Sequence, residues 1–154
     1  MTSYLVDTGI LLSLVDRSAP HHSAIRDALR RLKGLGADLV TTAQNHAEFW
    51  NVCTRPVTAR GCLGMNPSEA DGKLRLLERA FRMLPESPST YSVWRRLVVQ
   101  HGVIGVQAHD ARLVAGMLAN GVDRILTLNP SDFARYTGIV SLTPDQVRNE
   151  PAAH

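Results

Sequence analysis

The sequence predicts a single α/β domain of three α/β/α layers, in which helices cover both faces of a central, mainly parallel sheet. Short apolar runs rich in β-branched residues alternate along the chain with longer stretches whose apolar residues recur at helical spacing. Strands that alternate with helices pair in parallel through helical crossovers. A chain of 154 residues is long enough for one well-buried core and too short for two.

The first third of the chain is expected to contain two strands and three helices. Residues 4–6 form a short apolar strand, and the apolar run 9–15 that follows it is a buried helix. A proline opens the second helix over 20–33, which ends at a Gly-Leu-Gly stop. Residues 38–42 are strand-like, and a third helix covers 43–54 and ends before a proline.

The middle of the chain is expected to contain a loop and three more helices. Residues 57–67 have no clear period and carry two glycines and a proline, which predicts a loop. Ser68 caps the next helix, which reaches about Leu84. After a break between two prolines, helices cover 89–101 and 108–119, and the second of them ends at an Asn-Gly stop.

The last third of the chain supplies the final two strands. Residues 124–128 and 139–142 are apolar and β-branched, as strands of a buried sheet are. The segment after them shows no comparable pattern. We therefore expect one folded domain over residues 1–143 and a loosely held tail over 144–154.

The composition is typical of a soluble globular protein, with 44% hydrophobic and 20% charged residues. No apolar run approaches the roughly 20 residues that a membrane helix needs. The N-terminus also lacks the basic and apolar segments of a secretory signal. We expect a cytoplasmic protein with no membrane partner, in which Cys53 and Cys62 are free thiols.

The net charge of +3 is small, but the basic residues are unevenly spread. Arg26, Arg30, Arg31 and Lys33 form one cluster within the second predicted helix. Such a cluster attracts a polyanion, and it also keeps a helix face soluble. Charge alone therefore leaves nucleic-acid binding open without establishing it.

Two aspartates occupy positions where an apolar residue would fit more easily. Asp7 directly follows the first predicted strand, at the edge where open parallel sheets bind ligands, although it would also serve as the N-cap of the next helix. Asp110 precedes Leu113 and Val114 by three and four residues, so it lies on the core-facing stripe of its helix. A buried charge there needs a cation, an open cleft or the backbone N–H groups of the helix start.

Glu48 is the third candidate, in the helix that follows the second strand and begins at the same edge of the sheet. Taken alone, it could be an ordinary, partly exposed helical glutamate. If the three ends converge, three negative charges share a cleft and repel unless a hard cation neutralises them. Oxygen ligands suit Mg²⁺ or Mn²⁺ better than zinc, and such ions activate a water and hold a phosphate. Acids with basic residues around them therefore indicate phosphodiester hydrolysis.

Four stretches of the sequence follow one another in an order known from one protein family. They are Tyr-Leu-Val-Asp-Thr at 4–8, Ala-Glu-Phe-Trp-Asn at 47–51 with Thr-Arg-Pro at 54–56, His-Asp-Ala-Arg-Leu-Val-Ala at 109–115, and Leu-Thr-Leu-Asn-Pro-Ser-Asp-Phe at 126–133. Together they resemble the PIN-domain nucleases, and specifically the VapC-type toxins of bacterial toxin–antitoxin pairs. The resemblance covers nearly the whole chain.

The resemblance implies an α/β/α domain and a divalent-metal endoribonuclease. Asp7 and Asp110 would ligate Mg²⁺ or Mn²⁺, and Glu48 would be a further ligand or the group that orients the water. In the family a metal-bound water attacks the phosphorus without a covalent protein intermediate, and Thr8 is a candidate for a contact with that water or a phosphate. The resemblance also implies a cognate antitoxin that inhibits the enzyme, and a homodimer.

The sequence departs from the family pattern at one position. Many PIN domains carry a fourth acid after the last-but-one strand, where this chain has Asn129, which offers a carbonyl oxygen but no charge. Asp132 lies three residues further on and could partly substitute, or it could be an acid in the first turn of a short helix. A second metal ion is therefore expected to bind more weakly than the first.

Three functions follow from these observations. The favoured one is a toxin-type endoribonuclease that cleaves single-stranded or looped RNA. A non-catalytic module that binds nucleic acid or a partner on the same fold would bind RNA without forming products, and Asn129 favours this alternative. A receiver-like phosphoacceptor, which also gathers acids at a sheet edge, would take a phosphate onto one aspartate from a small phosphodonor.

Overall fold

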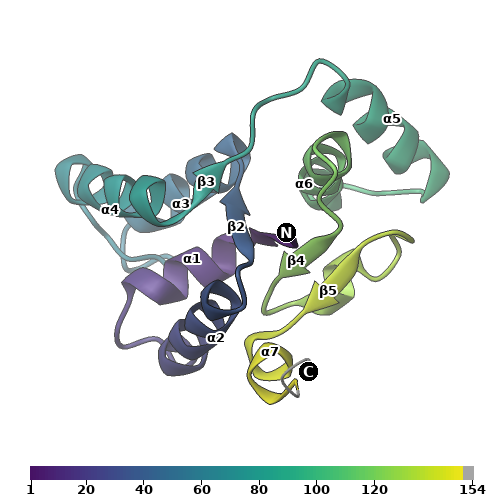
Figure 1. The fold of residues 1–154 in the computed structure, drawn as a ribbon. Helices are drawn as coiled ribbons and strands as arrows, with labels where there is room; N and C mark the ends of the chain where they lie inside the picture. The colour runs from purple at the N-terminus through teal and green to yellow at the C-terminus, as the bar shows by residue number, and fades with distance from the viewer. Residues whose placement is uncertain (151–154) are drawn as a thin grey trace.

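At the centre of the structure, a computed structural model that describes residues 1–150, lies a five-stranded sheet (Figure 1). Its strands are ordered β3-β2-β1-β4-β5, and each neighbouring pair is parallel. They are β1 (Ser3–Val6), β2 (Asp38–Thr41), β3 (Arg82–Met83), β4 (Arg124–Leu126) and β5 (Val140–Leu142). The predicted three-layer α/β fold is confirmed, and all of the described strand pairs are parallel.

The inner strands are buried on both faces, because helices cover each side of the sheet. In β1, Tyr4 and Val6 join the core on one face, whereas Leu5 joins the core on the other. Leu39 and Val40 of β2 divide between the two cores in the same way. Burial on both faces explains why these strands are continuous apolar runs in the sequence.

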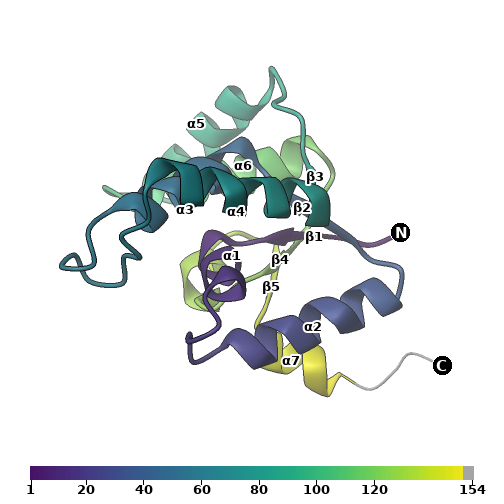
Figure 2. The same ribbon diagram turned by 90° about the vertical axis from the view of Figure 1, so that its left-hand side faces the viewer.

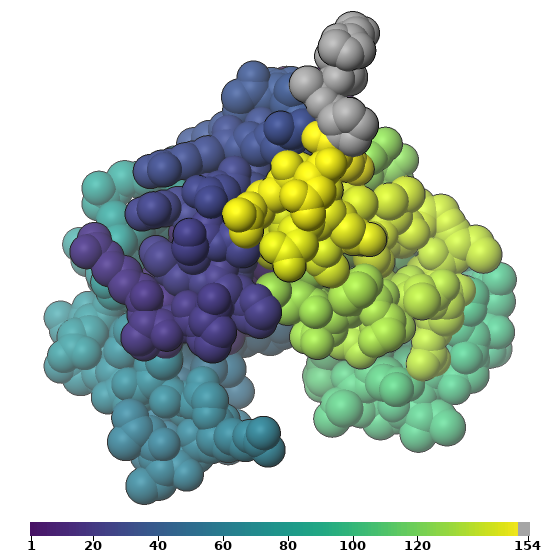
Figure 3. Space-filling model, turned by 90° about the horizontal axis from the view of Figure 1, so that it is seen from below, coloured from purple at the N-terminus to yellow at the C-terminus, as the bar shows by residue number. Residues whose placement is uncertain are grey.

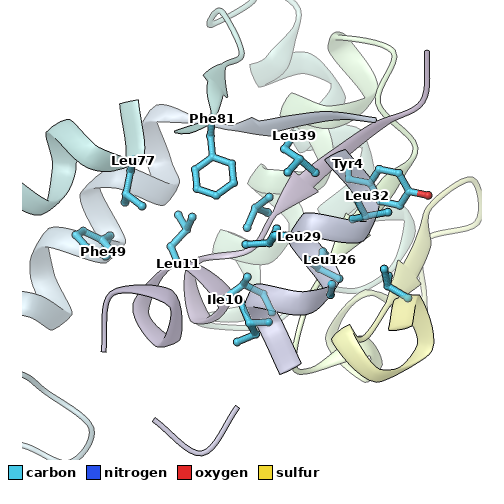
Figure 4. Close-up of a cluster of buried hydrophobic side chains, with 14 of the residues drawn as sticks. Tyr4, Ile10, Leu11, Leu29, Leu32, Leu39, Phe49, Leu77, Phe81 and Leu126 are labelled. Atoms are coloured by element: carbon cyan, nitrogen blue, oxygen red, sulfur yellow. The ribbon is translucent and has the colours of Figure 1, made fainter. Parts of the chain in front are cut away.

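The helices form the two outer layers (Figures 1 and 2). The first layer contains α1 (Thr8–Val15), α2 (His22–Gly34), α3 (Ala43–Thr54), α4 (Pro67–Ala80) and α7 (Pro144–Asn149). The second contains α5 (Thr90–Gln100), α6 (Gln107–Ala119) and the 3-10 helix η1 (Pro130–Phe133). Figure 4 shows part of the first core, where Phe49 and Leu77 pack near Leu11. None of the described helices is long and apolar enough to cross a membrane.

The end of α4 differs from the prediction of a helix that reaches Leu84. The helix ends at Ala80, and the next residues form the short strand β3, which pairs with β2. Phe81 and Leu84, on either side of β3, are both buried, and a two-residue strand is too short to show a period of its own. The N-cap is also not Ser68 but Asn66, whose side chain accepts from the Glu69 N–H.

The expected loose tail over 144–154 is wrong for its first part. Residues 144–149 form α7, which begins with a capping box between Thr143 and Gln146 and packs against α2. Val147 is 1% exposed and belongs to the first core. A six-residue helix with one buried apolar turn shows too little periodicity to be recognised in the sequence. Residues 151–154 lie outside the described residues.

Candidate active site

The site lies where the strand order of the sheet reverses. The chain moves from β1 to β2 on one side and later returns to β4 on the other side of β1. Open parallel sheets bind ligands at the carboxyl ends of the strands at such a point. Asp7 follows the last residue of β1, and Thr127 follows the last residue of β4.

Asp7 uses both of its carboxylate oxygens at this edge. Oδ1 accepts a hydrogen bond from the Thr8 N–H at 2.9 Å and so caps α1, while Oδ2 accepts one from the Thr127 hydroxyl at 2.7 Å. The pKa of Asp7 is raised mainly by burial, against the lowering effect of these two hydrogen bonds, and the charges of Glu48 and Asp132 raise it further. The N-cap role is thus confirmed, and it leaves each oxygen a lone pair for another partner.

Glu48 points to the same edge and is held at both oxygens. Oε2 accepts from the Thr8 hydroxyl at 2.8 Å, and Oε1 accepts from the Gln44 side-chain amide at 2.8 Å. The buried Asn45 in turn donates to the Thr8 hydroxyl at 3.1 Å. A hydroxyl has one proton to give, and that of Thr8 goes to Glu48. Thr8 therefore orients Glu48, and its hydroxyl oxygen keeps a second lone pair for another donor.

Asp110 lies half-buried in the first turn of α6, as the sequence predicts. Its pKa is raised to about 6, first by burial and then by the negative charges of Asp132, Asp7 and Glu48. Among the described residues, no hydrogen bond to the carboxylate offsets this shift. The three predicted acids therefore share one electrostatic environment, and the backbone of the helix start does not satisfy Asp110.

The fourth negative charge comes from Asp132 in η1. Asp132 is exposed, and its charge raises the pKa of both Asp7 and Asp110. Asn129 is also exposed, and its backbone N–H donates to the Thr127 hydroxyl at 3.1 Å. Asp132 thus acts electrostatically on the acids, while Asn129 supports Thr127 through its backbone.

The donor set fits a hydrated divalent cation better than a closed metal cage. Within residues 1–150, no three acid, histidine or cysteine side chains stand close enough together to form a ready-made metal site. The acids offer only oxygen ligands, and neighbouring negative charges raise the pKa of Asp7 and of Asp110. Mg²⁺ prefers oxygen, keeps several of its waters and binds through one or two carboxylates. Loosely spaced carboxylates suit that mode of binding.

The approach to this edge is open and partly aromatic. Seen from below, the molecule has a notch between the chain that follows α3 and the chain around the start of α6 (Figure 3). Arg112 of α6 lines a surface cavity of about 330 Å³ together with Tyr91 and Trp94 of α5. The Trp94 ring is fixed by a hydrogen bond from its N–H to the Ala108 carbonyl at 2.9 Å.

The sequence did not identify three polar residues that organise the acids. Thr127 holds Asp7, Gln44 holds Glu48, and Asn45 holds Thr8. Thr127 could have been found by the signal that marked Asp7, a polar residue directly after an apolar strand. The other two lie in the first turn of a helix, where amide side chains are common and give no such signal.

Comparisons with known proteins agree with this architecture. The family model described as the PIN domain matches residues 4–139. Among curated proteins no sequence match was found.

Several solved structures are similar in fold over almost their whole length. VapBC2 from Rickettsia felis, solved with a DNA fragment of its promoter, has a TM-score of 0.68 at 15% identity and covers 92% of this chain and 98% of its own. VapBC-1 from nontypeable Haemophilus influenzae has a TM-score of 0.67 at 18% identity and covers 94% of this chain and 99% of its own. VapC20 from Mycobacterium tuberculosis is described as a toxin that cleaves the sarcin–ricin loop. It has a TM-score of 0.62 at 16% identity and covers 88% of this chain and 98% of its own.

Proposed function

This chain belongs to the PIN domain family, and on that premise we propose that it is a divalent-metal-dependent endoribonuclease. It would act in the cytoplasm as the toxin of a type II toxin–antitoxin pair and hydrolyse RNA phosphodiester bonds. The observation that carries the proposal is the electrostatic coupling of Asp110 to Asp7 and Glu48 at the strand-order reversal of the sheet. Carboxylates that repel one another in a ligand-binding position favour the binding of a cation.

Asp7 and Asp110 would bind Mg²⁺ or Mn²⁺, with Glu48 as a further ligand or as the group that orients the water. When bound, such an ion lowers the pKa of a water and stabilises charge on the phosphate. Thr127 fixes the orientation of Asp7, and Thr8 fixes that of Glu48. A carboxylate held at both oxygens is placed to accept a proton from a water beside it.

RNA as the substrate is supported by the surface around the acids. Tyr91 and Trp94 line a cavity beside the site and offer aromatic rings to an unstacked base, while Arg112 in the same wall pairs with Glu86. The description of VapC20 as a toxin that cleaves the sarcin–ricin loop also supports a looped RNA as the target.

Cleavage of a labelled, looped RNA under metal titration tests the proposal. The wild-type protein should produce fragments in Mg²⁺ or Mn²⁺, EDTA should stop the reaction, and added metal should restore it. Asp7→Asn should fold but not cleave, because asparagine keeps the cap of α1 and loses the charge. Asp123→Asn is the matched control, since this exposed acid precedes β4 at the opposite edge of the sheet. Full activity of Asp7→Asn would overturn the assignment.

An antitoxin partner is supported by the similar structures and by one face of the first helical layer. The Rickettsia felis and Haemophilus influenzae structures are both VapBC proteins. Here, cavities of about 190 and 360 Å³ adjoin Leu14 and combine apolar walls with basic residues such as Arg26 and Lys73. An amphipathic, acidic segment of an antitoxin fits that chemistry. We also propose a homodimer, which light scattering of the purified chain would test.

The non-catalytic binding module is the second candidate, and Asn129 favours it. This residue stands where the family has an acid, and an asparagine adds no charge to the site. The same cleavage experiment separates the two functions. Retention of the RNA without products, at saturating Mn²⁺, would establish the module.

A further inference from the structure

We infer that Gln44 is a positioning residue that sets the placement of Glu48 relative to Asp110, and that Arg112 holds the Gln44 amide in the orientation this requires. The inference rests on the proposed function, because it concerns how the two acids are held for a divalent ion. The contacts that support it join α3 of the first helical layer to α6 of the second.

The two acids come from helices on opposite faces of the sheet. Glu48 belongs to α3, whose Phe49 packs in the first core, and Asp110 belongs to α6, whose Leu113 packs in the second. Each helix therefore packs on its own side of the shared sheet. Contacts between the starts of the two helices add to the sheet in setting how the acids are placed.

The Gln44 amide nitrogen makes that junction. Gln44 lies four residues before Glu48 on the same face of α3, and its Nε2 donates to Glu48 Oε1 at 2.8 Å. The same nitrogen donates to the backbone carbonyl of His109, the residue before Asp110, at 2.7 Å. An amide nitrogen has two protons. Gln44 therefore gives one proton to the Glu48 carboxylate and the other to the backbone next to Asp110.

Arg112 determines which way the Gln44 amide faces. Its Nη1 donates to Gln44 Oε1 at 3.0 Å, and it also pairs with Glu86 at 3.6 Å. A guanidinium only donates, so the amide oxygen must face it and the nitrogen must face Glu48. The reversed amide would place its oxygen against two acceptors, the Glu48 carboxylate and the His109 carbonyl.

Two variants and a matched control separate positioning from folding. Gln44→Met keeps the length of the side chain and loses all three hydrogen bonds, whereas Gln44→Glu keeps the acceptor for Arg112 and loses both donors. Gln107→Met is the control, because Gln107 lies in the first turn of the same helix as Asp110 and its amide accepts from Arg135 at 2.9 Å. Metal-free melting temperatures should match the wild type in Gln44→Met and Gln107→Met, and should fall in Gln44→Glu, which places a carboxylate oxygen against Glu48 and the His109 carbonyl.

Two quantities are measured. The first is Mn²⁺ binding in the absence of RNA, detected by the thermal shift that it causes, and the second is the kinetics of RNA cleavage. Both Gln44 variants should raise the half-saturating Mn²⁺ concentration by about 10–100-fold, the usual cost of losing a residue that orients a ligand. They should lower kcat and leave the KM for RNA unchanged, because Gln44 faces the acids. Gln107→Met should match the wild type in both. Wild-type Mn²⁺ binding by Gln44→Met would overturn the inference.

A double-variant cycle tests the part assigned to Arg112. If Arg112 acts through Gln44, Arg112→Met should weaken Mn²⁺ binding in the wild type and add nothing to Gln44→Met. Additive effects, or a raised KM alone, would show that Arg112 acts on RNA directly. If the wild type neither binds Mn²⁺ nor cleaves RNA, the proposed function fails and this inference fails with it. If the wild type does both and the Gln44 variants do the same, this inference alone fails.

Discussion

At the scale of single residues, Asp7 shows that a structural and a functional role can coincide. Its carboxylate caps α1 and also bonds across the strand-order reversal to Thr127. Both bonds hold the side chain at the edge of the sheet, although burial raises its pKa. Oriented hydrogen bonds of this kind prepare a ligand for a metal ion before the ion arrives.

Loss of the Thr127 hydroxyl should weaken both the fold and the metal site. Thr127 is fully buried, and Thr127→Val keeps its shape while Asp7 Oδ2 and the Asn129 N–H lose a partner. We expect a cost of about 1–3 kcal/mol in the free energy of unfolding. We also expect a fall of about 10–100-fold in Mn²⁺ affinity, both measured by denaturation with and without Mn²⁺. Thr127→Ser should restore Mn²⁺ affinity; a Ser variant as weak as the Val variant would contradict this role.

The raised pKa of Asp110 predicts opposite effects of pH on the metal-free and the metal-bound protein. Because the folded-state pKa is about 6 and the ordinary value is 3.8, the folded protein binds this proton more tightly than the unfolded chain. Without metal, the contribution of Asp110 to the free energy of unfolding should fall as pH rises from the lower value to the higher. Mn²⁺ needs the deprotonated carboxylate, so its affinity should fall as pH drops through about 6.

Asp110→Asn tests both effects, because asparagine does not titrate. Denaturation across this pH range without metal should show a flatter profile than the wild type. The variant should also lose Mn²⁺ binding at every pH. A wild-type pH profile in Asp110→Asn would assign the titration to another group.

At the scale of helices and strands, the sequence predicts the elements that repeat a pattern and misses those that do not. Helix α3 and strand β2 lie within a residue of their expected bounds, because their apolar spacing and the following proline are strong signals. Strand β3 and helix α7 are each six residues or shorter. Strand β3 depends on pairing with β2, and α7 depends on packing against α2. The spacing of apolar residues within such short segments does not show these contacts.

The packing of α7 predicts that the end of the described chain contributes to stability. Val147→Ala should lower the free energy of unfolding by about 1–3 kcal/mol, because it opens space in the first core. Val99→Ala is the control, since Val99 is 76% exposed in α5 and should change stability by less than about 0.5 kcal/mol. Chemical denaturation measures both. Equal stability of Val147→Ala and the wild type would show that α7 adds little to the fold.

At the scale of the whole molecule, the site is a product of topology. The positions of Asp7, Glu48 and Asp110 were predictable because each lies within about two turns of a strand end or a helix start, and a parallel sheet brings those ends to one edge. The hydrogen bonds that orient them were not predictable. Thr127 reaches Asp7 over 120 residues because β4 pairs with β1, and Arg112 reaches Gln44 over 68 residues where α6 meets α3. No local pattern in the sequence records either pairing.

Direct titration of Mn²⁺ into the metal-free protein, followed by calorimetry, tests this account most directly. The wild type should show saturable binding, and Asp7→Asn and Asp110→Asn should each abolish it. Asp71→Asn, which changes a half-exposed acid of α4 paired with Arg75, should bind as the wild type does. Absence of saturable binding in the wild type, or binding that survives both substitutions, would contradict the account.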